Sequence, residues 1–186
     1  MTTVEPIRKK SDIKKVEQVL ASQSKRNLLL FVLGTNCGLR ISDILSLNVA
    51  DVRNKSHIQI VERKTGKFKK FPINDRLKPM IEEFVKGRKN VEPLFLSHWG
   101  HRLDRVTAYY IIRNACEEAG IQANVGTHTM RKTFGYHHYQ QFKDVVILQK
   151  IFNHSSSQIT LRYIGIEQDQ IDDSYSNFIL SCLSSL

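Results

Sequence analysis

Hydrophobic residues recur at helical spacing over most of the chain. Ser11 is a candidate N-cap for a helix that carries apolar residues at 13, 16, 19 and 20. The apolar run Lys25–Cys37 is followed by Gly38, a residue typical of a helix C-terminus. Further helices are predicted for Ser42–Leu47, Asn74–Gly87, Asp104–Ala119, Thr129–Phe142, Asp144–Phe152, Gln158–Tyr163 and Asp172–Leu183. The pattern therefore predicts a mainly helical protein.

One short region changes to a period of two. His57–Glu62 and Phe68–Ile73 alternate as strands do, and the Gly-containing segment Lys64–Lys67 between them predicts a hairpin. Leu94–Leu96 is a candidate third strand. Since no repeat or linker interrupts the chain, we expect one domain over residues 1–186, mostly α with a small antiparallel β-sheet.

The charge of the chain indicates what kind of partner it binds. The chain has 28 Lys and Arg against 18 Asp and Glu, a net charge of +10. Such an excess favours a polyanion such as nucleic acid, although a merely basic protein has the same balance. Cys37, Cys116 and Cys182 form no CxxC pair, which predicts reduced thiols in the cytoplasm. No signal peptide or membrane-length apolar run is present, so we expect no membrane partner.

Gly38-Leu39-Arg40 falls at a predicted junction between two helices. A guanidinium beside the backbone N–H groups of a helix start suits a phosphate. The alternative is a surface arginine paired with Asp43.

The predicted hairpin is rich in basic residues. A protruding basic hairpin can enter a groove of nucleic acid and bring an ammonium to a phosphate. Lysines also keep an exposed strand edge from pairing with other sheets, so the cluster alone does not decide between the two roles. Its members are Arg63, Lys64, Lys67, Lys69 and Lys70.

Two histidines lie near other candidate groups. His128 and Arg131 are three residues apart and share a helical face, so both could reach one anion. His154 precedes Tyr163 by nine residues, across a predicted turn and helix. Taken singly, each histidine fits a structural role equally well.

Together, two arginines, two histidines, a lysine and a tyrosine suit phosphoryl transfer without a metal. A tyrosine oxygen can attack phosphorus and hold a covalent intermediate. Arginines stabilise the charge on the phosphate oxygens. A lysine can protonate the leaving alkoxide, and a histidine can move the tyrosine proton.

The segment from about Ile7 to Tyr163 resembles the tyrosine recombinases, or phage integrase family. Cys37–Leu47 is similar to the family's G-L-R-x-S-E-x-x-x-L box, which implies that Arg40 is the first catalytic arginine. The basic hairpin is similar to that of the family and implies Lys64 as the catalytic lysine, with Lys67 as its nearest competitor.

The last two motifs complete the resemblance. His128-Thr129-Met130-Arg131 is similar to the H-x-x-R box, which implies that His128 and Arg131 are catalytic. Asn153–Tyr163 is similar to the L-G-H-S-S…T-x-x-Y ending, which implies His154 as a catalytic residue and Tyr163 as the nucleophile.

The resemblance implies a tyrosine recombinase catalytic-domain fold and site-specific cutting and rejoining of double-stranded DNA. Tyr163 would form a 3′-phosphotyrosyl link and release a 5′-hydroxyl, with no metal or other cofactor. A topoisomerase-like relaxation of supercoils would use the same groups. Direct DNA contacts are expected from Arg63, Lys67, Lys69, Lys70 and Lys132.

The family also implies a tetramer on DNA, in which each C-terminal helix docks on a neighbour. An apolar stripe in a tail helix of about residues 171–184 suits this role, although packing in the chain's own core is the alternative. The stripe consists of Ile171, Tyr175, Phe178, Ile179, Cys182 and Leu183.

Several positions depart from the family pattern. Asp43 replaces a Glu, which we expect to loosen a buried pairing with the active-site arginines. Asn153 replaces a Gly, a tolerable change because Asn also adopts left-handed backbone. Lys132 stands where a His is frequent. The family's core-binding domain is not found ahead of the catalytic one, and we therefore expect weak, salt-dependent DNA affinity.

Two other functions are alternatives to recombination. One is a DNA-binding regulator on a recombinase fold with little or no catalysis. The other is a metal-dependent nuclease, which no carboxylate cluster or HExxH spacing supports. Its metal ligands would be His98, His101, His137 and His138.

Overall fold

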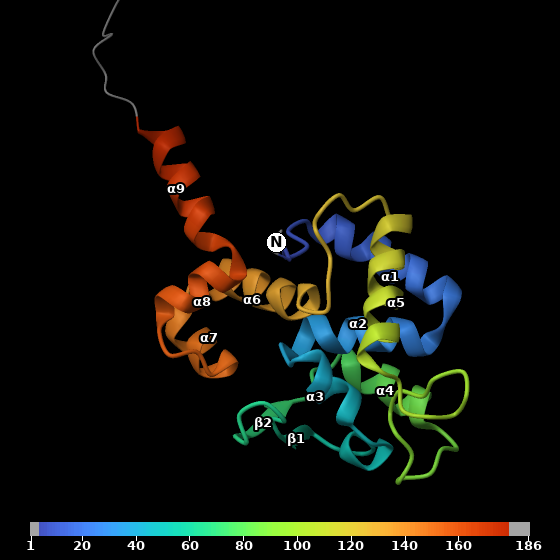
Figure 1. The fold of residues 1–186 in the computed structure, drawn as a ribbon. Coiled ribbons are helices and arrows are strands. Elements are labelled where there is room, and N and C mark those ends of the chain that lie inside the picture. The colour runs from blue at the N-terminus through green and yellow to red at the C-terminus, as the bar shows by residue number, and fades with distance from the viewer. Residues whose placement is uncertain (1–3, 179–186) are drawn as a thin grey trace, which may run out of the picture.

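The computed structural model describes residues 4–178, apart from the side chains of residues 167–170, and Figure 1 shows its ribbon. No helix in this range is both long and apolar enough to cross a membrane. The elements are α1 (Lys10–Gln23), α2 (Lys25–Cys37), α3 (Ile41–Ser46), a 3-10 helix (Val49–Asp51), β1 (His57–Val61), β2 (Phe68–Pro72), α4 (Leu77–Val85), α5 (Arg105–Glu118), α6 (Thr129–Phe142), α7 (Val145–Phe152), α8 (Ser157–Ile164) and α9 (Ile166–Asn177).

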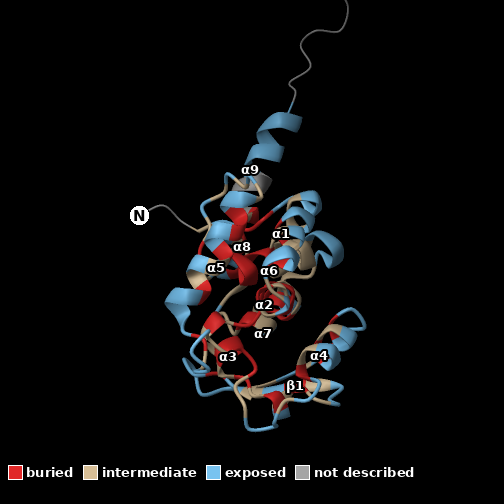
Figure 2. Cartoon of the chain, turned by 90° about the vertical axis from the view of Figure 1, so that its right-hand side faces the viewer, coloured by how far each residue is buried: buried red, intermediate tan, exposed pale blue. Residues whose placement is uncertain are grey.

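Helix α2 lies at the centre of the helical body. Residues Leu29–Leu33 are all buried, and the helix packs against α1, α4 and α6 (Figure 2). A helix covered on every side must be apolar all round, which explains the uninterrupted apolar run. Because α2 leads directly to Gly38 and Arg40, its burial fixes where the first motif begins.

A smaller core joins α6, α7 and α8. Leu148, Phe152 and Ile164 are buried in it. A Cβ on Gly135 of α6 would lie 2.6 Å from Cγ2 of Ile164 and 2.7 Å from Cε2 of Phe152. Helix α8, which carries Tyr163, can therefore approach α6 only because position 135 has no side chain.

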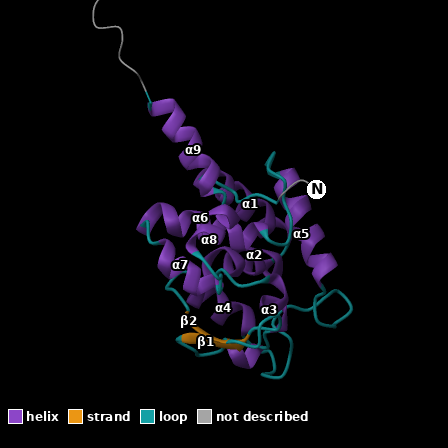
Figure 3. Ribbon diagram, turned by 60° about the vertical axis from the view of Figure 1, so that its left-hand side comes forward, coloured by secondary structure: helices purple, strands orange, loops and turns teal. Residues whose placement is uncertain are grey.

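The hairpin forms as predicted, with β1 and β2 antiparallel (Figure 3). Ile60 is the register partner of Lys69. Directly opposed side chains lie on one face of a sheet, so Lys69 points the same way as the half-buried Ile60. Phe68 and Lys70 are exposed on the opposite face. The basic residues of the hairpin are thus divided between its two faces.

The expected third strand at Leu94–Leu96 is wrong. The N–H of Leu94 donates to the carbonyl of Leu47, 2.8 Å away, just beyond the end of α3. Leu96 forms an isolated bridge with Arg102. These partners tie the segment to the helical body, and the sheet within the described residues consists of β1 and β2.

Several element ends differ from the predicted ones, among them the starts of α1, α4 and α9. Ser11 lies inside α1, whose N-cap is Lys9. Asn74 precedes α4, and its side-chain oxygen accepts the N–H of Leu77 at 2.9 Å. Helix α9 begins at Ile166, earlier than predicted, and reaches Asn177. The predicted tail positions Ile179, Cys182 and Leu183 lie outside the described residues.

Candidate active site

The turn between α2 and α3 positions Arg40. Gly38 ends α2 with φ 62°, a left-handed backbone that favours glycine, and a Cβ there would lie 2.5 Å from the ring of Phe134. Arg40 follows as the N-cap of α3. Its Nη1 lies 2.7 Å from Oε1 of Glu62, and 17% of its side chain is exposed. The alternative pairing of Arg40 with Asp43 is therefore wrong.

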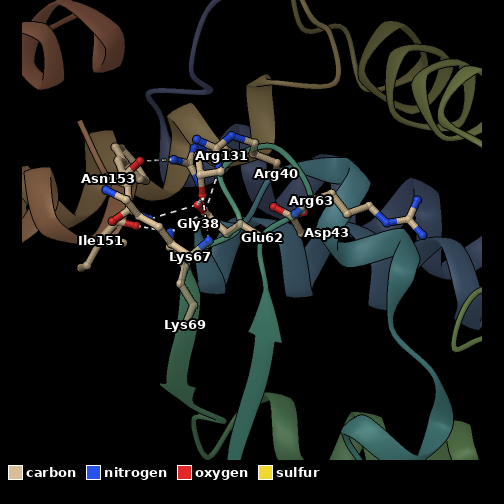
Figure 4. A network of polar contacts seen from close by, with 12 residues as sticks. Gly38, Arg40, Asp43, Glu62, Arg63, Lys67, Lys69, Arg131, Ile151 and Asn153 are labelled. Atoms are coloured by element: carbon tan, nitrogen blue, oxygen red, sulfur yellow. Dashed lines mark hydrogen bonds and ion pairs between the residues drawn. The ribbon is translucent and has the colours of Figure 1, made fainter. Parts of the chain in front are cut away.

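Arg131 of α6 is almost completely buried, with 2% exposed. Its Nη1 donates to the carbonyl of Gly38 at 2.5 Å, and its Nη2 donates to that of Phe152 at 2.9 Å. The guanidinium also lies over the Phe152 ring, 4.4 Å from its centroid. One side chain thus joins the end of α2, helix α6 and the end of α7, and Figure 4 shows it in one polar network with Arg40.

Tyr163 lies on α8 between the two predicted histidines. Its hydroxyl is 3.2 Å from Nδ1 of His128, and its ring centroid is 5.1 Å from that of His154. Burial raises the pKa of Tyr163, while the charge and hydrogen bond of Arg131 oppose the rise. The phenol therefore stays protonated at neutral pH, so that an attacking oxygen needs a proton acceptor.

Both site histidines are held neutral. Burial lowers the pKa of His128, and nearby positive charges lower it further. Burial and the charges of Arg131, Arg40 and Lys69 lower the pKa of His154 to about 4. A neutral imidazole at 3.2 Å from the phenol can accept its proton.

His154 is oriented from both sides. Asn153 ends α7 with φ 54°, the left-handed conformation expected of the residue at this place. On the other side, Nδ1 of His154 lies 3.1 Å from the hydroxyl oxygen of Thr160 on α8. The turn between α7 and α8 thus holds the imidazole beside Tyr163.

The loop between the strands exposes most of the basic residues. Lys64 makes no hydrogen bond or ion pair within the described part of the chain. Its side chain is therefore free to reach a bound phosphate. The exposed basic residues of the hairpin are Arg63, Lys64, Lys67 and Lys70.

Two of the predicted DNA contacts point inward. The ammonium of Lys69 lies 2.8 Å from Oε1 of Glu62 and also donates to the carbonyl of Ile151. Lys132 is 7% exposed, with its ammonium 5.0 Å from the centre of the Tyr163 ring. Both ammonium groups therefore face the cluster of site residues rather than solvent.

Sequence reasoning missed Glu62 as a residue of this site. It continues the inward positions 58 and 60 of β1, and a carboxylate on an inward face requires partners. The two-residue period of β1 was therefore the signal in the sequence that could have identified Glu62. Asp43, the acidic residue of the first motif, accepts the N–H of Arg63 at 3.1 Å instead of pairing with an arginine side chain.

The four histidines of the nuclease alternative do not gather. His98 and His101 lie in an exposed loop, whereas His137 lies on α6 with its Nε2 2.9 Å from the carbonyl oxygen of Ile7. Within the described residues no group of three or more His, Cys, Asp or Glu side chains could hold a metal ion. The arrangement of these histidines therefore does not support the nuclease hypothesis.

Comparison with known sequences identifies the family. The phage integrase family matches residues 9–169. The chain belongs to this family. It is 47% identical over 179 residues to the probable integrase/recombinase YoeC of Bacillus subtilis, covering 96% of this chain and 98% of YoeC. It is 26% identical to the tyrosine recombinase XerD of Oceanobacillus iheyensis, of which it spans 55%.

Solved structures agree on the fold. The XerA recombinase superposes with a TM-score of 0.76 at 20% identity, over 95% of this chain and 64% of XerA. The catalytic domain of bacteriophage HP1 integrase gives a TM-score of 0.67 at 22% identity, over 98% of this chain and 100% of that domain. The fold is therefore that of a tyrosine recombinase catalytic domain, and the chain is a site-specific recombinase by family.

Proposed function

We propose that this chain cuts and rejoins double-stranded DNA with Tyr163 as the nucleophile. The observation that carries the proposal is the short distance between the Tyr163 hydroxyl and His128, in a cluster of side chains that also includes Arg131. The Tyr163 oxygen bonds to the scissile phosphorus while the bond to the 5′ oxygen breaks. This step leaves a 3′-phosphotyrosyl link and a free 5′-hydroxyl, and attack by a 5′-hydroxyl reverses it.

Each proton in this step has a proposed carrier. His128 takes the phenolic proton, because its imidazole is neutral and lies 3.2 Å away. Lys64, exposed on the hairpin loop, gives a proton to the leaving 5′ oxygen. Side chains alone carry both transfers, so the proposed reaction proceeds in the presence of a chelator.

The remaining groups stabilise charge. Arg40 and Arg131 hold the non-bridging oxygens of the phosphate, on which negative charge accumulates in the transition state. The ring of His154 lies 5.1 Å from that of Tyr163 and is affected by the charges of both arginines, and this imidazole is proposed to contact the same phosphate. Arg131 is already fixed by two carbonyls, so little reorganisation is needed when DNA binds.

We propose that the exposed hairpin residues contact the DNA backbone, namely Arg63, Lys67 and Lys70. We also propose that the reaction takes place in the cytoplasm. Solved relatives include XerH bound to its difH substrate and a lambda integrase dimer bound to a COC′ core site. The +10 net charge supports a polyanionic partner.

Assembly through α9 is proposed as well. This helix projects from the body in Figure 1, and Ile171, Tyr175 and Phe178 are exposed on it. Docking on a second copy would cover these apolar side chains in a tetramer on DNA. Sedimentation of the protein with and without DNA measures the assembly.

The test of the proposed function is covalent capture. A duplex that carries the target site and a nick beside the scissile phosphate should accumulate a protein–DNA adduct that survives denaturation. Tyr163→Phe should abolish the adduct, because it removes the attacking oxygen and keeps the ring. An adduct with Tyr163→Phe would exclude this nucleophile, whereas full biological activity of that variant would favour the DNA-binding regulator.

A further inference from the structure

Glu62 is a fully buried carboxylate at the base of the hairpin loop. It directly follows β1, and its exposed fraction is 0%. Its N–H donates to the carbonyl of Lys67 at 2.9 Å, and its own carbonyl accepts the N–H of Gly66 at 2.8 Å. The backbone of Glu62 thus closes the loop that carries Lys64.

The side chain of Glu62 contacts three separate segments. Oε1 lies 2.7 Å from Nη1 of Arg40, before α3, and 2.8 Å from the ammonium of Lys69 on β2. Oε2 accepts from the hydroxyl of Thr65 at 2.6 Å and from the amide of Asn153 at 3.0 Å. Figure 4 shows Glu62 within this network, between the hairpin and the two arginines.

This carboxylate is ionised in the folded protein. Burial opposes its ionisation, but the hydrogen bonds from Lys69, Thr65, Arg40 and Asn153 outweigh burial and lower the pKa of Glu62 to about 2. A buried charge with this many partners holds each of them in a narrow range of positions. Among them, Arg40 is a proposed phosphate ligand, and Asn153 directly precedes His154.

We propose that Glu62 is a positioning residue of the recombination reaction. It orients Arg40 toward the phosphate and fixes the Lys64 loop and the Asn153–His154 turn relative to that arginine. The inference rests on the proposed function. In this chain Glu62 is thus the acidic partner of Arg40, while Asp43 accepts the backbone N–H of Arg63.

A purely structural role makes a different prediction. A buried ion pair is often replaceable by apolar groups, because desolvation offsets much of the attraction between the charges. If Glu62 served only to neutralise the charge of Lys69, Glu62→Gln would not slow cleavage further in a protein that already carries Lys69→Met. If Glu62 positions Arg40, removing both charges would leave Arg40 without its carboxylate and the reaction slow.

The experiment measures single-turnover cleavage of the nicked duplex at saturating DNA, and DNA affinity separately. Glu62→Gln should lower the cleavage rate about 10²-fold, the size expected when a reacting geometry is misplaced by about 1 Å. DNA affinity should change little. Glu62→Asp keeps the charge and should cleave faster than Glu62→Gln. Glu83→Gln is the matched control, because it removes an exposed ion pair with Lys25.

Lys69→Met, alone and with Glu62→Gln, completes the test. We expect the double variant to fold. Its cleavage rate should be lower than that of Lys69→Met by the same factor by which Glu62→Gln lowers the rate of the wild-type chain. If the double variant cleaves as fast as Lys69→Met alone, Glu62 only balances a buried lysine and the proposal is wrong. Equal rates for Glu62→Gln and Glu83→Gln would overturn it too.

Hydrogen exchange separates a failure of this proposal from a failure of the proposed function. Glu62→Gln should speed amide exchange at Gly66 and in the turn around Asn153, whereas Glu83→Gln should leave both unchanged. A wild-type chain that forms no adduct contradicts the proposed chemistry, and the exchange data still decide the contacts of Glu62. Unchanged exchange in both segments would show that Glu62 holds neither.

Discussion

His154 lies among positive charges that keep its imidazole neutral, with a pKa lowered from 6.5 to about 4. Between these two values the unfolded chain binds more protons at this residue than the folded chain does. The contribution of His154 to stability is therefore fully present above about pH 6.5 and is lost as the pH falls toward 4. We expect the free energy of unfolding to decrease over that interval.

Urea unfolding at a series of pH values across this window measures the effect. His154→Asn should flatten the dependence, although not abolish it, because the pKa of His128 is lowered as well. His98→Asn, in an exposed loop, is the control and should keep the wild-type slope. Equal slopes for the two variants would mean that the charges around His154 do not penalise its protonation.

At the residue scale, the motifs predicted which side chains meet, and the structure brings Arg40, Arg131, both histidines and Tyr163 into one cluster. Their catalytic roles remain predictions. The motifs did not predict what holds them, because Glu62 lies outside every motif. Its contact with Asn153 joins residues 91 positions apart, and no local pattern encodes such a distance.

Close packing between α6 and α8 brings Tyr163 next to the other site residues. A Cβ at Gly135 would stand 2.6 Å from Cγ2 of Ile164, the residue that follows Tyr163, so Gly135→Ala must shift the side chains of Ile164 and Phe152 or the helices that carry them. Overpacking of this kind costs about 1–3 kcal/mol, and the better helix propensity of alanine returns about 1 kcal/mol. We expect a net loss of up to about 2 kcal/mol together with slower cleavage.

Thermal unfolding and the adduct assay together measure both effects. Gln141→Ala, exposed on the same helix, introduces alanine without the clash and should preserve stability and cleavage. Loss of stability with an unchanged cleavage rate would show that the position of α8 is not critical for the reaction.

At the element scale, the sequence predicted helices better than isolated pairings. Helices α2 and α6 have the predicted bounds, because both their apolar residues and their ends are visible locally. Leu94–Leu96 has strand-forming residues, but its partners Leu47 and Arg102 belong to a helix end and a loop. Apolar content alone therefore could not distinguish a strand from a buried connecting segment.

At the scale of the whole molecule, positive charge is abundant, but part of it is buried in the protein interior. Lys69 and Lys132 are turned inward, whereas Arg63, Lys64, Lys67 and Lys70 remain exposed on the hairpin. A net charge of +10 alone would attract DNA to any face. Direct contacts of the hairpin cations with phosphates and the general attraction of the net charge differ in how DNA binding responds to salt. Only cations in contact with phosphates release condensed ions.

Lys67→Ala combined with Lys70→Ala should therefore lower the salt dependence of DNA binding. Each lost phosphate contact reduces the slope of log K against log salt by about 0.9, so the double variant should lose up to about 2. Lys10→Ala with Lys14→Ala removes the same charge from exposed positions of α1 and should keep the slope. Fluorescence anisotropy with a labelled duplex at several salt concentrations gives both slopes. If the slope decreased equally in the two double variants, DNA binding would depend on the overall charge, and the hairpin would not be part of the DNA interface.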